Sequence, residues 1–308
     1  MGVCMSFSIV SSRELPFLTR SIFVFCLLFA GSAGTSCFAQ DVASPPLENR
    51  PPILDSFSGT ELVLGSTTLL GLGILSIWGE EWIGPDAPSM GAPSEGSVDL
   101  RFSRWANPDF DPKQKWLGGA PDLLGYAAPA LALGYYVGGS IISGGEGWGG
   151  AHPHEAIAFA EGLSWAMFST TLLKRIVGRE RPFVARGALG EIDTDAVEMS
   201  RSERLLSFPS GHSTSIAATS FFIAADVSDA LVSGPLKSKP IWVKGLVGRA
   251  LPYLSATGLS WLVMYSRIKD QRHWLSDTLT GGVIGALGGL ISYHIHFDSS
   301  GEPYSARP

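Results

Sequence analysis

The sequence predicts an all-α protein, a bundle of about six core helices. Hydrophobic residues make up 45% of the 308 residues and charged residues only 16%, below the roughly 25% that is typical of soluble domains. The apolar residues fall in long runs rich in Leu, Ala and Gly, which favour helix over strand. The sequence contains no alternating hairpin pattern, no Asn-Gly turn and no internal repeat, so nothing in it indicates a sheet.

The first 39 residues are typical of an export signal. Arg13 and Arg20 precede an apolar run at 21–30, and small residues lead up to Ala39. This run is too short to span a bilayer and has the flanks of a signal peptide. We therefore predict cleavage after Ala39, with an uncleaved anchor as the alternative. All three cysteines lie in this segment, so the mature chain would have no disulfide, no Cys metal site and no thiol nucleophile.

The rest of the chain divides into a linker, a helical domain and a tail. A Pro-rich linker is predicted at 40–58, the helical domain at 59–298 and a flexible tail at 299–308. Each core helix is predicted from one long apolar run, and in chain order the runs are 60–79, 121–143, 154–178, 212–230, 251–267 and 273–296.

The last of these runs has glycines at every fourth position, at Gly281, Gly285 and Gly289. Four residues are close to one turn, so the three glycines share one face of the helix. A row of small residues lets another helix approach closely. We therefore expect a tightly packed neighbour along this face.

The first of three polar motifs, Lys-Arg-Ile-Val-Gly-Arg-Glu-Arg-Pro, begins at Lys174 and contains Arg181. Seven residues are nearly two helical turns, which places both cations on one helix face, and Pro182 is expected to end that helix. Two cations on one face can bind phosphate oxygens, with Arg offering a planar fork. The alternative is a pair of basic residues that merely suits the helix dipole.

The second motif is Pro209-Ser210-Gly211-His212. Ser210 is a good N-cap for the apolar helix that follows, and Gly211 lets backbone N–H groups approach an anion at that helix N-terminus. His212 could donate a proton to a leaving oxygen. The alternative is an ordinary cap beside a surface histidine.

The third motif runs from Ser266 to Asp277 and contains Arg267 and His273. His273 and Asp277 are four residues apart, so we expect them on one helix face. A carboxylate that accepts one imidazole N–H would fix the tautomer and free the other nitrogen to attack. The alternative is a plain helical pair that adds little stability.

Together the three motifs supply the parts of a phosphoryl-transfer site. The transferred group carries charge on three oxygens, with attacking and leaving groups in line. The sequence offers three cations, a capped helix N-terminus and two histidines, each where an apolar run meets a polar joint. We therefore predict an active site at the helix ends on one rim of the bundle.

In this order the runs Lys-x6-Arg-Pro, Pro-Ser-Gly-His and Ser-Arg-x5-His-x3-Asp resemble the signature of the type 2 phosphatidic acid phosphatases (PAP2). That superfamily also includes bacterial acid phosphatases and vanadium haloperoxidases. The resemblance covers about residues 120–295. It implies a metal-independent phosphatase without a cofactor, in which vanadate would bind as an inhibitor or transition-state mimic.

The resemblance also implies a role for each matched residue. His273 would attack phosphorus, Asp277 would orient His273, and His212 would protonate the leaving alkoxide. The phosphoryl oxygens would be held by Lys174, Arg181, Ser210, the amide of Gly211 and Arg267. Two alternatives remain: a vanadium-dependent haloperoxidase, and a helical bundle that binds phospholipid without turnover.

Charge and hydropathy bear on the partners and the location. The formal net charge of −6 leaves no broad basic field for nucleic acid. The resemblance implies a lipid phosphate or a small phosphomonoester as the substrate. Several runs approach the length of a membrane span, although Glu161 would be costly in lipid. The acidic segment 80–120 and the basic segment 231–249 favour a site that faces the cell envelope or periplasm. We expect association with a membrane, with an exported soluble bundle as the alternative. The number of spans, the substrate and the oligomeric state stay open.

Overall fold

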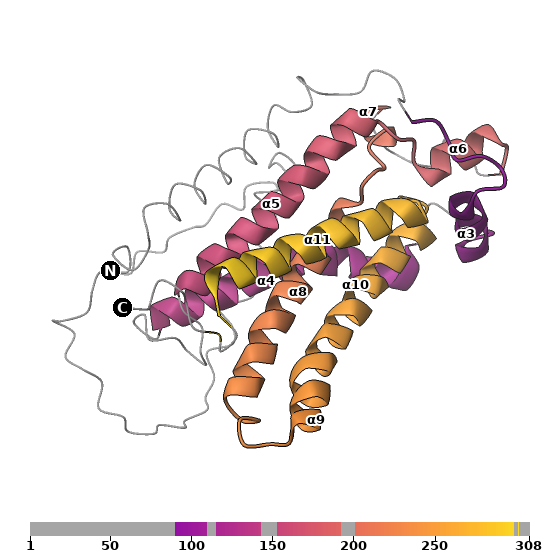
Figure 1. The fold of residues 1–308 in the computed structure, drawn as a ribbon. Coiled ribbons are helices and arrows are strands. Elements are labelled where there is room, and N and C mark those ends of the chain that lie inside the picture. The colour runs from indigo at the N-terminus through magenta and orange to yellow at the C-terminus, as the bar shows by residue number, and fades with distance from the viewer. Residues whose placement is uncertain (1–89, 110–114, 143–152, 192–200, 299–300, 302–308) are drawn as a thin grey trace, which may run out of the picture. The chain divides into compact units, whose positions relative to one another are not determined.

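The structure, a computed structural model, describes residues 90–109, 115–142, 153–191, 201–298 and 301. Every element in these ranges is helical, and the one extended pairing among them is an isolated bridge between Met90 and Arg179. The predicted all-α fold is therefore confirmed (Figure 1). The predicted signal peptide, the linker and the helix at 60–79 lie outside the described residues.

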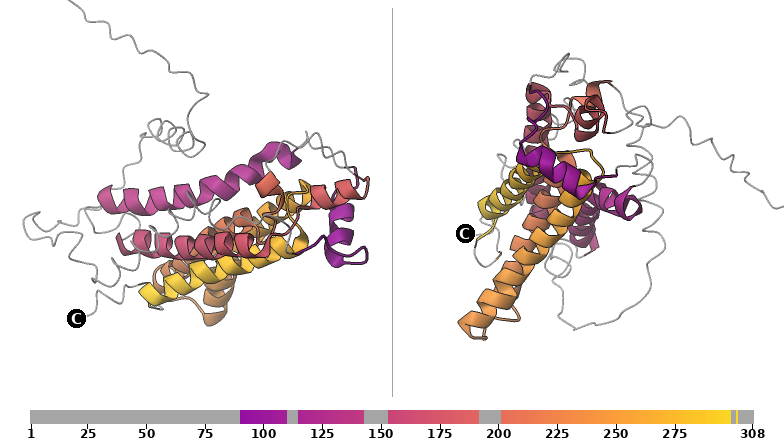
Figure 2. Two further views of the ribbon diagram at one scale, coloured as in Figure 1. Left: turned by 90° about the horizontal axis from the view of Figure 1, so that it is seen from above. Right: turned by 90° about the vertical axis from the view of Figure 1, so that its right-hand side faces the viewer.

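Five long helices form the bundle, and each matches a run predicted from the sequence. They are α4 (Ala120–Ile142), α5 (Pro153–Val177), α8 (Gly211–Ser233), α10 (Leu251–Lys269) and α11 (Leu275–His296). Helix α8 lies at the centre and contacts the other four. Figures 1 and 2 show α5 and α11 running side by side along their lengths.

The predicted glycine row packs α11 against α8, as expected. A Cβ atom on Gly281 would lie 3.2 Å from the backbone nitrogen of Ser210, and a Cβ on Gly289 would lie 3.1 Å from that of Phe222. Both distances are shorter than ordinary van der Waals contact. The close approach of these two helices therefore depends on the absence of side chains along this face of α11.

Buried aromatic rings fill the bundle at the end where α5 begins and α11 finishes. Phe222 of α8 lies 5.4 Å from Phe159, 5.7 Å from Tyr136 and 5.4 Å from Tyr293, measured between ring centroids. The three pairs meet edge to face, an arrangement that stabilises beyond burial alone. This cluster fixes the helices at the end of the bundle away from the three motifs.

Short helices complete the described chain. Near the motifs lie α3 (Val98–Ala106) and α6 (Pro182–Ala188), and between α8 and α10 the chain forms a turn (Figure 1). The remaining short elements are η3 (Trp116–Gly119), α7 (Arg201–Arg204), α9 (Ile241–Val243) and η4 (Lys244–Ala250), the last of which is a π-helix. None of these was predicted, because such short segments cannot show the apolar periodicity of a core helix.

Two predicted placements on helices are wrong. Helix α5 ends at Val177, where Gly178 adopts a positive φ of 54°, and Pro182 begins α6 rather than ending α5. Lys174 and Arg181 are therefore on different helices, with Arg181 at the N-cap of α6. Helix α11 begins at Leu275, so His273 precedes it and does not share a helix face with the carboxylate four residues later.

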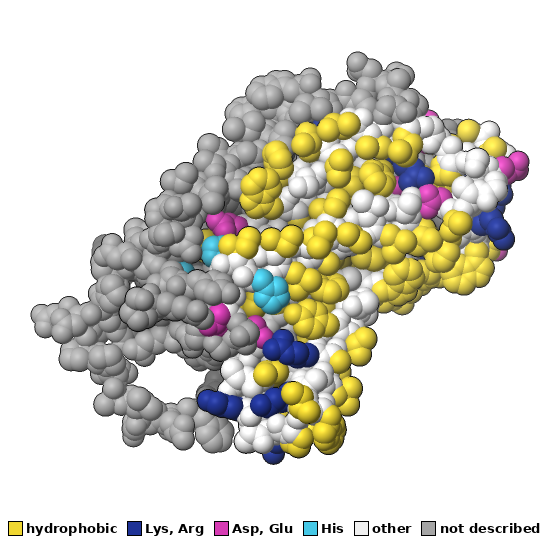
Figure 3. Space-filling model, viewed as in Figure 1, with side chains coloured by type: hydrophobic (Ala, Val, Ile, Leu, Met, Phe, Trp, Pro, Cys, Tyr) yellow, Lys and Arg dark blue, Asp and Glu magenta, His cyan; other side chains and the backbone are white. Residues whose placement is uncertain are grey.

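Three helices are long and apolar enough to cross a membrane: His154–Val177, Gly211–Ser233 and Leu275–His296. The outer face of α11 exposes Val283, Leu287 and Ile291 at four-residue spacing, and an apolar band follows this helix in Figure 3. Glu161 inside α5 is partnered by His296, whose Nε2 lies 2.8 Å from its Oε2. These features indicate association with a membrane.

Candidate active site

The three motifs meet where four long helices have their ends. Lys174 comes from the end of α5 and its Nζ donates to the carbonyl of Leu206, 2.8 Å away. The backbone N–H of Ser210, before α8, donates to the carbonyl of Asp277 in α11 at 3.0 Å. At the end of α10, the carbonyl of Arg267 accepts the N–H of His273 at 3.2 Å. The predicted convergence on one rim is confirmed.

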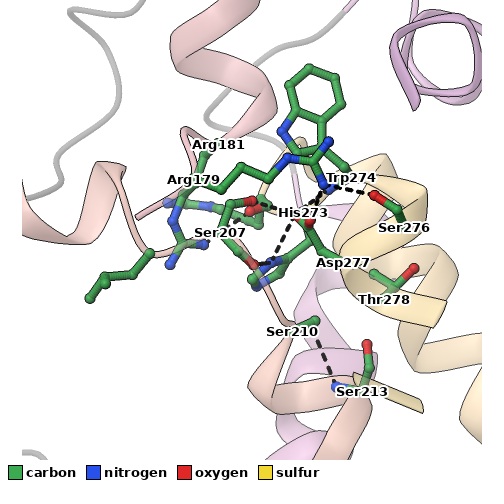
Figure 4. Close-up of polar contacts among 12 residues, drawn as sticks. Arg179, Arg181, Ser207, Ser210, Ser213, His273, Trp274, Ser276, Asp277 and Thr278 are labelled. Carbon is green, nitrogen blue, oxygen red and sulfur yellow. Dashed lines mark hydrogen bonds and ion pairs between the residues drawn. The ribbon is translucent and has the colours of Figure 1, made fainter. Parts of the chain in front are cut away.

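His273 is held in one tautomer by a backbone carbonyl. Its Nδ1 lies 2.7 Å from the carbonyl oxygen of Ser207, and only 2% of the residue is exposed. A carbonyl oxygen can only accept, so Nδ1 carries the proton and Nε2 has a free lone pair. Figure 4 shows the imidazole beside Ser207. This arrangement leaves Nε2 as the nitrogen able to react.

Asp277 does not make the direct contact that we predicted from its spacing. Its Oδ2 lies 3.8 Å from Nδ1 of His273, beyond hydrogen-bond range. The buried carboxylate instead accepts from the hydroxyl of Ser207 at 2.5 Å and from the N–H of Trp274 at 2.9 Å. Asp277 therefore contributes to the position of His273 only indirectly. It holds Ser207, whose carbonyl contacts the imidazole, and Trp274, which follows His273 in the chain.

Arg179 is a further member of the site that sequence reasoning missed. Its NH1 donates to Asp277 at 2.5 Å and to Ser276 at 2.7 Å, and its NH2 donates to Asp99 at 2.7 Å. Asp99 also accepts the N–H of Ser276 at 2.8 Å. Arg179 stands inside the first motif and could have been noticed there, whereas Asp99 is 177 residues from Ser276 and gives no local signal.

Two cations of the first motif are held by neutral acceptors. Arg181 donates from Nε to the carbonyl of Glu203 at 2.8 Å and from NH1 to the carbonyl of Arg272 at 3.0 Å. Lys174 likewise donates to a carbonyl. Backbone carbonyls fix these side chains without neutralising their charge, so the charge remains available to an anion.

The start of α8 forms the predicted capped N-terminus. The hydroxyl of Ser210 accepts the N–H of Ser213 at 3.4 Å, and the carbonyl of Ser210 accepts the N–H of Thr214 at 3.0 Å. The first N–H groups of a helix have no acceptor within it. After this capping, the amides of Gly211 and His212 are the ones left for an anion at the helix N-terminus.

Helix α4 positions the imidazole of His212. The ring lies edge-on to Tyr126 at a centroid distance of 4.3 Å. A Cβ atom on Gly125 would lie 3.3 Å from the Cβ of His212, so the glycine makes room for the histidine. These two contacts come from a segment that the motifs did not include.

Arg267 is paired with a carboxylate that we did not predict. Its NH1 forms an ion pair with Asp122 of α4, and Oδ2 of Asp122 lies 3.7 Å from Nζ of Lys115. The Nε of Arg267 is buried without a hydrogen-bond partner among the described residues. The NH1 nitrogen of this guanidinium is thus paired with α4, whereas its Nε has no acceptor among the described residues.

Residues 155–300, which contain all three motifs, match the family model of the PAP2 superfamily. This part of the chain is a PAP2 superfamily domain. Among curated proteins, the chain is 32% identical over 151 residues to a PA-phosphatase related-family protein of Dictyostelium discoideum, covering 47% of this chain and 50% of that one. It is 32% identical over 165 residues to diacylglycerol pyrophosphate phosphatase 1 of Saccharomyces cerevisiae, covering 48% and 54%.

The chain therefore spans about half the length of the curated relatives it matches. Among solved structures it is similar to that of a transmembrane PAP2-type phosphatidylglycerolphosphate phosphatase from Bacillus subtilis. The identity is 19%, the match covers 75% of this chain and 93% of that one, and the TM-score is 0.43.

The cations of the PAP2 domain act on His273 through their charge. Burial, and then the charges of Lys174, Arg181 and Arg267, lower the pKa of His273 well below its usual range. Burial, and then the charges of Arg267 and Arg272, lower the pKa of Arg181 to about 10. At neutral pH the imidazole is therefore uncharged while Arg181 keeps its charge.

The described part of the PAP2 domain contains no group of three or more His, Cys, Asp or Glu side chains placed to hold a metal ion. The rim instead gathers all the residues that the motifs named: Lys174, Arg181, Ser210, Gly211, His212, Arg267, His273 and Asp277. Their chemical roles, and the absence of a metal or cofactor, stay predictions.

Proposed function

We propose that the chain is a metal-independent phosphatase that hydrolyses a lipid phosphate through a phosphohistidine on His273. The observation that carries this proposal is the hydrogen bond of 2.7 Å between Nδ1 of His273 and the carbonyl of Ser207. It leaves the lone pair of Nε2 free in a neutral ring. A neutral nucleophile among cations is the combination that attack on an anionic phosphoryl group requires.

In the first step, Nε2 of His273 forms a bond to phosphorus as the P–O ester bond breaks. The negative charge of the bound phosphate favours the protonated form of His212 before the reaction. During this step His212 gives that proton to the leaving alkoxide and becomes neutral. The imidazole of His273 is then cationic, because it keeps its proton on Nδ1. The carbonyl of Ser207 stabilises this charge by accepting that proton's hydrogen bond.

In the second step, His212 takes a proton from water as the water oxygen attacks phosphorus. The N–P bond breaks, its electron pair returns to Nε2, and inorganic phosphate leaves. Lys174, Arg181 and Arg267 would hold the three equatorial oxygens together with the amides at the start of α8, as the hydrogen bonding of that helix allows. Every atom in the cycle comes from the substrate, water or this chain.

A lipid phosphate is the substrate class that we favour. The rim lies at the ends of helices long and apolar enough to cross a membrane, where a phosphate headgroup would meet it. One of the similar curated proteins is named as a phosphatase of diacylglycerol pyrophosphate, a phosphorylated lipid. With the predicted export signal and the basic 231–249 segment, these points support a site that faces the cell envelope or periplasm.

The test is phosphate release by the purified full chain in detergent, from phosphatidic acid and from glycerol 3-phosphate, with a chelator present. His273→Ala should lower the rate at least about a thousandfold, and His212→Ala about a hundredfold or more. His294→Ala, an exposed histidine on α11, is the matched control and should keep the rate. Rapid quenching with labelled substrate should trap an acid-labile label that His273→Ala loses. Loss of activity with chelator and its return with magnesium would refute the mechanism.

A further inference from the structure

The turn between α8 and α10 has a basic and apolar surface that the proposed catalytic mechanism does not use. Residues 234–250 contain no acidic residue and four cations, Lys237, Lys239, Lys244 and Arg249. Of these, Arg249 lies 3.6 Å from Asp229 of α8, measured from NH1 to Oδ1. Ile241 is 87% exposed and Trp242 67% exposed, and Figure 3 shows Lys and Arg side chains gathered at this end of the molecule. Cations beside an exposed Trp are typical of a segment at a membrane interface. We call residues 234–250 the basic tip.

An apolar groove of about 390 Å³ leads away from the basic tip between α8 and α10. Its apolar lining includes Ile223, Val227, Leu231, Val247, Leu251 and Leu259. The lining on α8 runs from Ser220 to Leu231, which is about 16 Å along the helix. The groove therefore has the elongated, apolar form that suits a hydrocarbon chain.

The groove and the basic tip are separate from the catalytic rim. Helix α8 begins at the rim with Gly211, and the groove lining starts at Ser220. Nine residues are about 14 Å of helix, and the whole of α8 is about 34 Å long. That length is close to the roughly 30 Å of a bilayer's hydrocarbon core. If α8 crosses the membrane, the rim and the basic tip lie at opposite membrane surfaces.

We propose that the basic tip and the groove together bind one anionic phospholipid. Its headgroup would contact the cations of the tip, and one acyl chain would lie in the groove between α8 and α10. The charge of the tip selects an anionic headgroup over a zwitterionic one. The groove runs beside a helix that is apolar enough to span, so its natural surroundings are lipid chains.

Charge also argues against a second copy of the chain as the occupant. A symmetric dimer through this surface would bring two basic tips together, because the same patch is used on both subunits. Like charges at short range repel. A phospholipid brings the opposite charge and the matching apolar chain in one molecule.

Recognition of the headgroup is tested with the delipidated full-length protein in detergent. The protein is titrated with phosphatidylglycerol or with phosphatidylcholine of the same acyl chains, and native mass spectrometry measures the bound lipid. We expect phosphatidylglycerol to bind and phosphatidylcholine to bind at least tenfold more weakly. Lys239→Gln with Lys244→Gln should weaken phosphatidylglycerol binding about 25-fold, since each cation near the surface is worth about a factor of five. Arg101→Gln, an exposed arginine on α3, is the control and should leave binding unchanged.

Binding of the acyl chain is tested by filling the groove with a larger side chain. Ser255 lines the groove and Thr257 does not, yet both are exposed on α10 and both donate to the carbonyl four residues before them. Ser255→Phe should lower phosphatidylglycerol binding at least tenfold, and Thr257→Phe should not. Glycerol phosphate, a headgroup without chains, should not compete at concentrations where phosphatidylglycerol saturates.

Three results would overturn this proposal: equal binding of the two lipids, equal effects of the two Phe substitutions, or a change in oligomeric mass with Ser255→Phe in place of a change in lipid binding. Hydrolysis of a soluble phosphomonoester by each variant is measured in parallel and should be retained. Because phosphatidylglycerol is a phosphodiester and the variants avoid the rim, lipid binding can succeed or fail independently of the proposed phosphatase activity.

Discussion

Gly285 offers the sharpest test of how helix packing controls the site. A Cβ atom there would lie 2.9 Å from the backbone nitrogen of Ala218 and closer still to the carbonyl oxygen of Thr214. Ordinary contact starts at 3.4 Å, so Gly285→Ala must push α11 from α8 by more than 0.5 Å. Overpacking of this kind costs about 1–3 kcal/mol. A catalytic group has to be held within about 0.5 Å of its productive place.

Gly285→Ala should therefore lower both stability and kcat. The start of α8 carries the amides that we propose bind the phosphate, and α11 follows closely after His273. Separation of the two helices therefore displaces these groups relative to each other. We expect kcat to fall about 10- to 100-fold, the effect of a misplacement near 1 Å. The assays are thermal unfolding in detergent and hydrolysis of a soluble phosphomonoester.

Gly282→Ala is the matched control on the same helix. Its Cβ would meet the end of the Met264 side chain, which is flexible and can move aside. We expect Gly282→Ala to keep kcat and to be neutral or slightly stabilising, since Ala is a better helix former than Gly by about 1 kcal/mol. Equal effects of the two substitutions, or full activity in Gly285→Ala, would refute the argument from close packing.

Two further predictions concern the charges around the nucleophile. The charge of Arg181 lowers the pKa of His273, so Arg181→Gln should raise that pKa towards its ordinary value and move the acid limb of the kcat/KM profile to higher pH; an unmoved limb would contradict the assignment. Arg179 touches Asp277 and Asp99 and acts as a positioning residue, so Arg179→Gln should lower kcat about 10- to 100-fold with little change in KM. Arg179→Lys should restore only part of the rate, because lysine cannot bridge two carboxylates with a planar fork.

The five long helices were predictable because each is a long apolar run. The predicted limits of α4 and α5 agree with the structure to one residue at either end. Periodicity and length are sufficient evidence where a helix is buried on several sides. The glycine row was predictable for the same reason, since it is a pattern within one helix.

The local geometry of the site was not predictable in the same way. Spacing alone suggested that His273 and Asp277 form a helical pair, but Trp274 caps α11 through its N–H bond to Asp277 and leaves His273 outside the helix. The carbonyl that fixes the imidazole belongs to Ser207, 66 residues away. A backbone carbonyl has no sequence signature, and long-range contacts depend on how the helices pack.

The polarity of the helices explains why each motif has its own composition. Helices α5 and α10 bring their C-termini to the rim, where the dipole favours cations such as Lys174 and Arg267. Helices α8 and α11 bring their N-termini, where it favours anions. The N-terminus of α11 is already occupied by Asp277, which accepts the N–H of Trp274. Of the two, we therefore expect the N-terminus of α8 to bind the phosphate, because the capping by Ser210 leaves the amides of Gly211 and His212 without an acceptor in the helix.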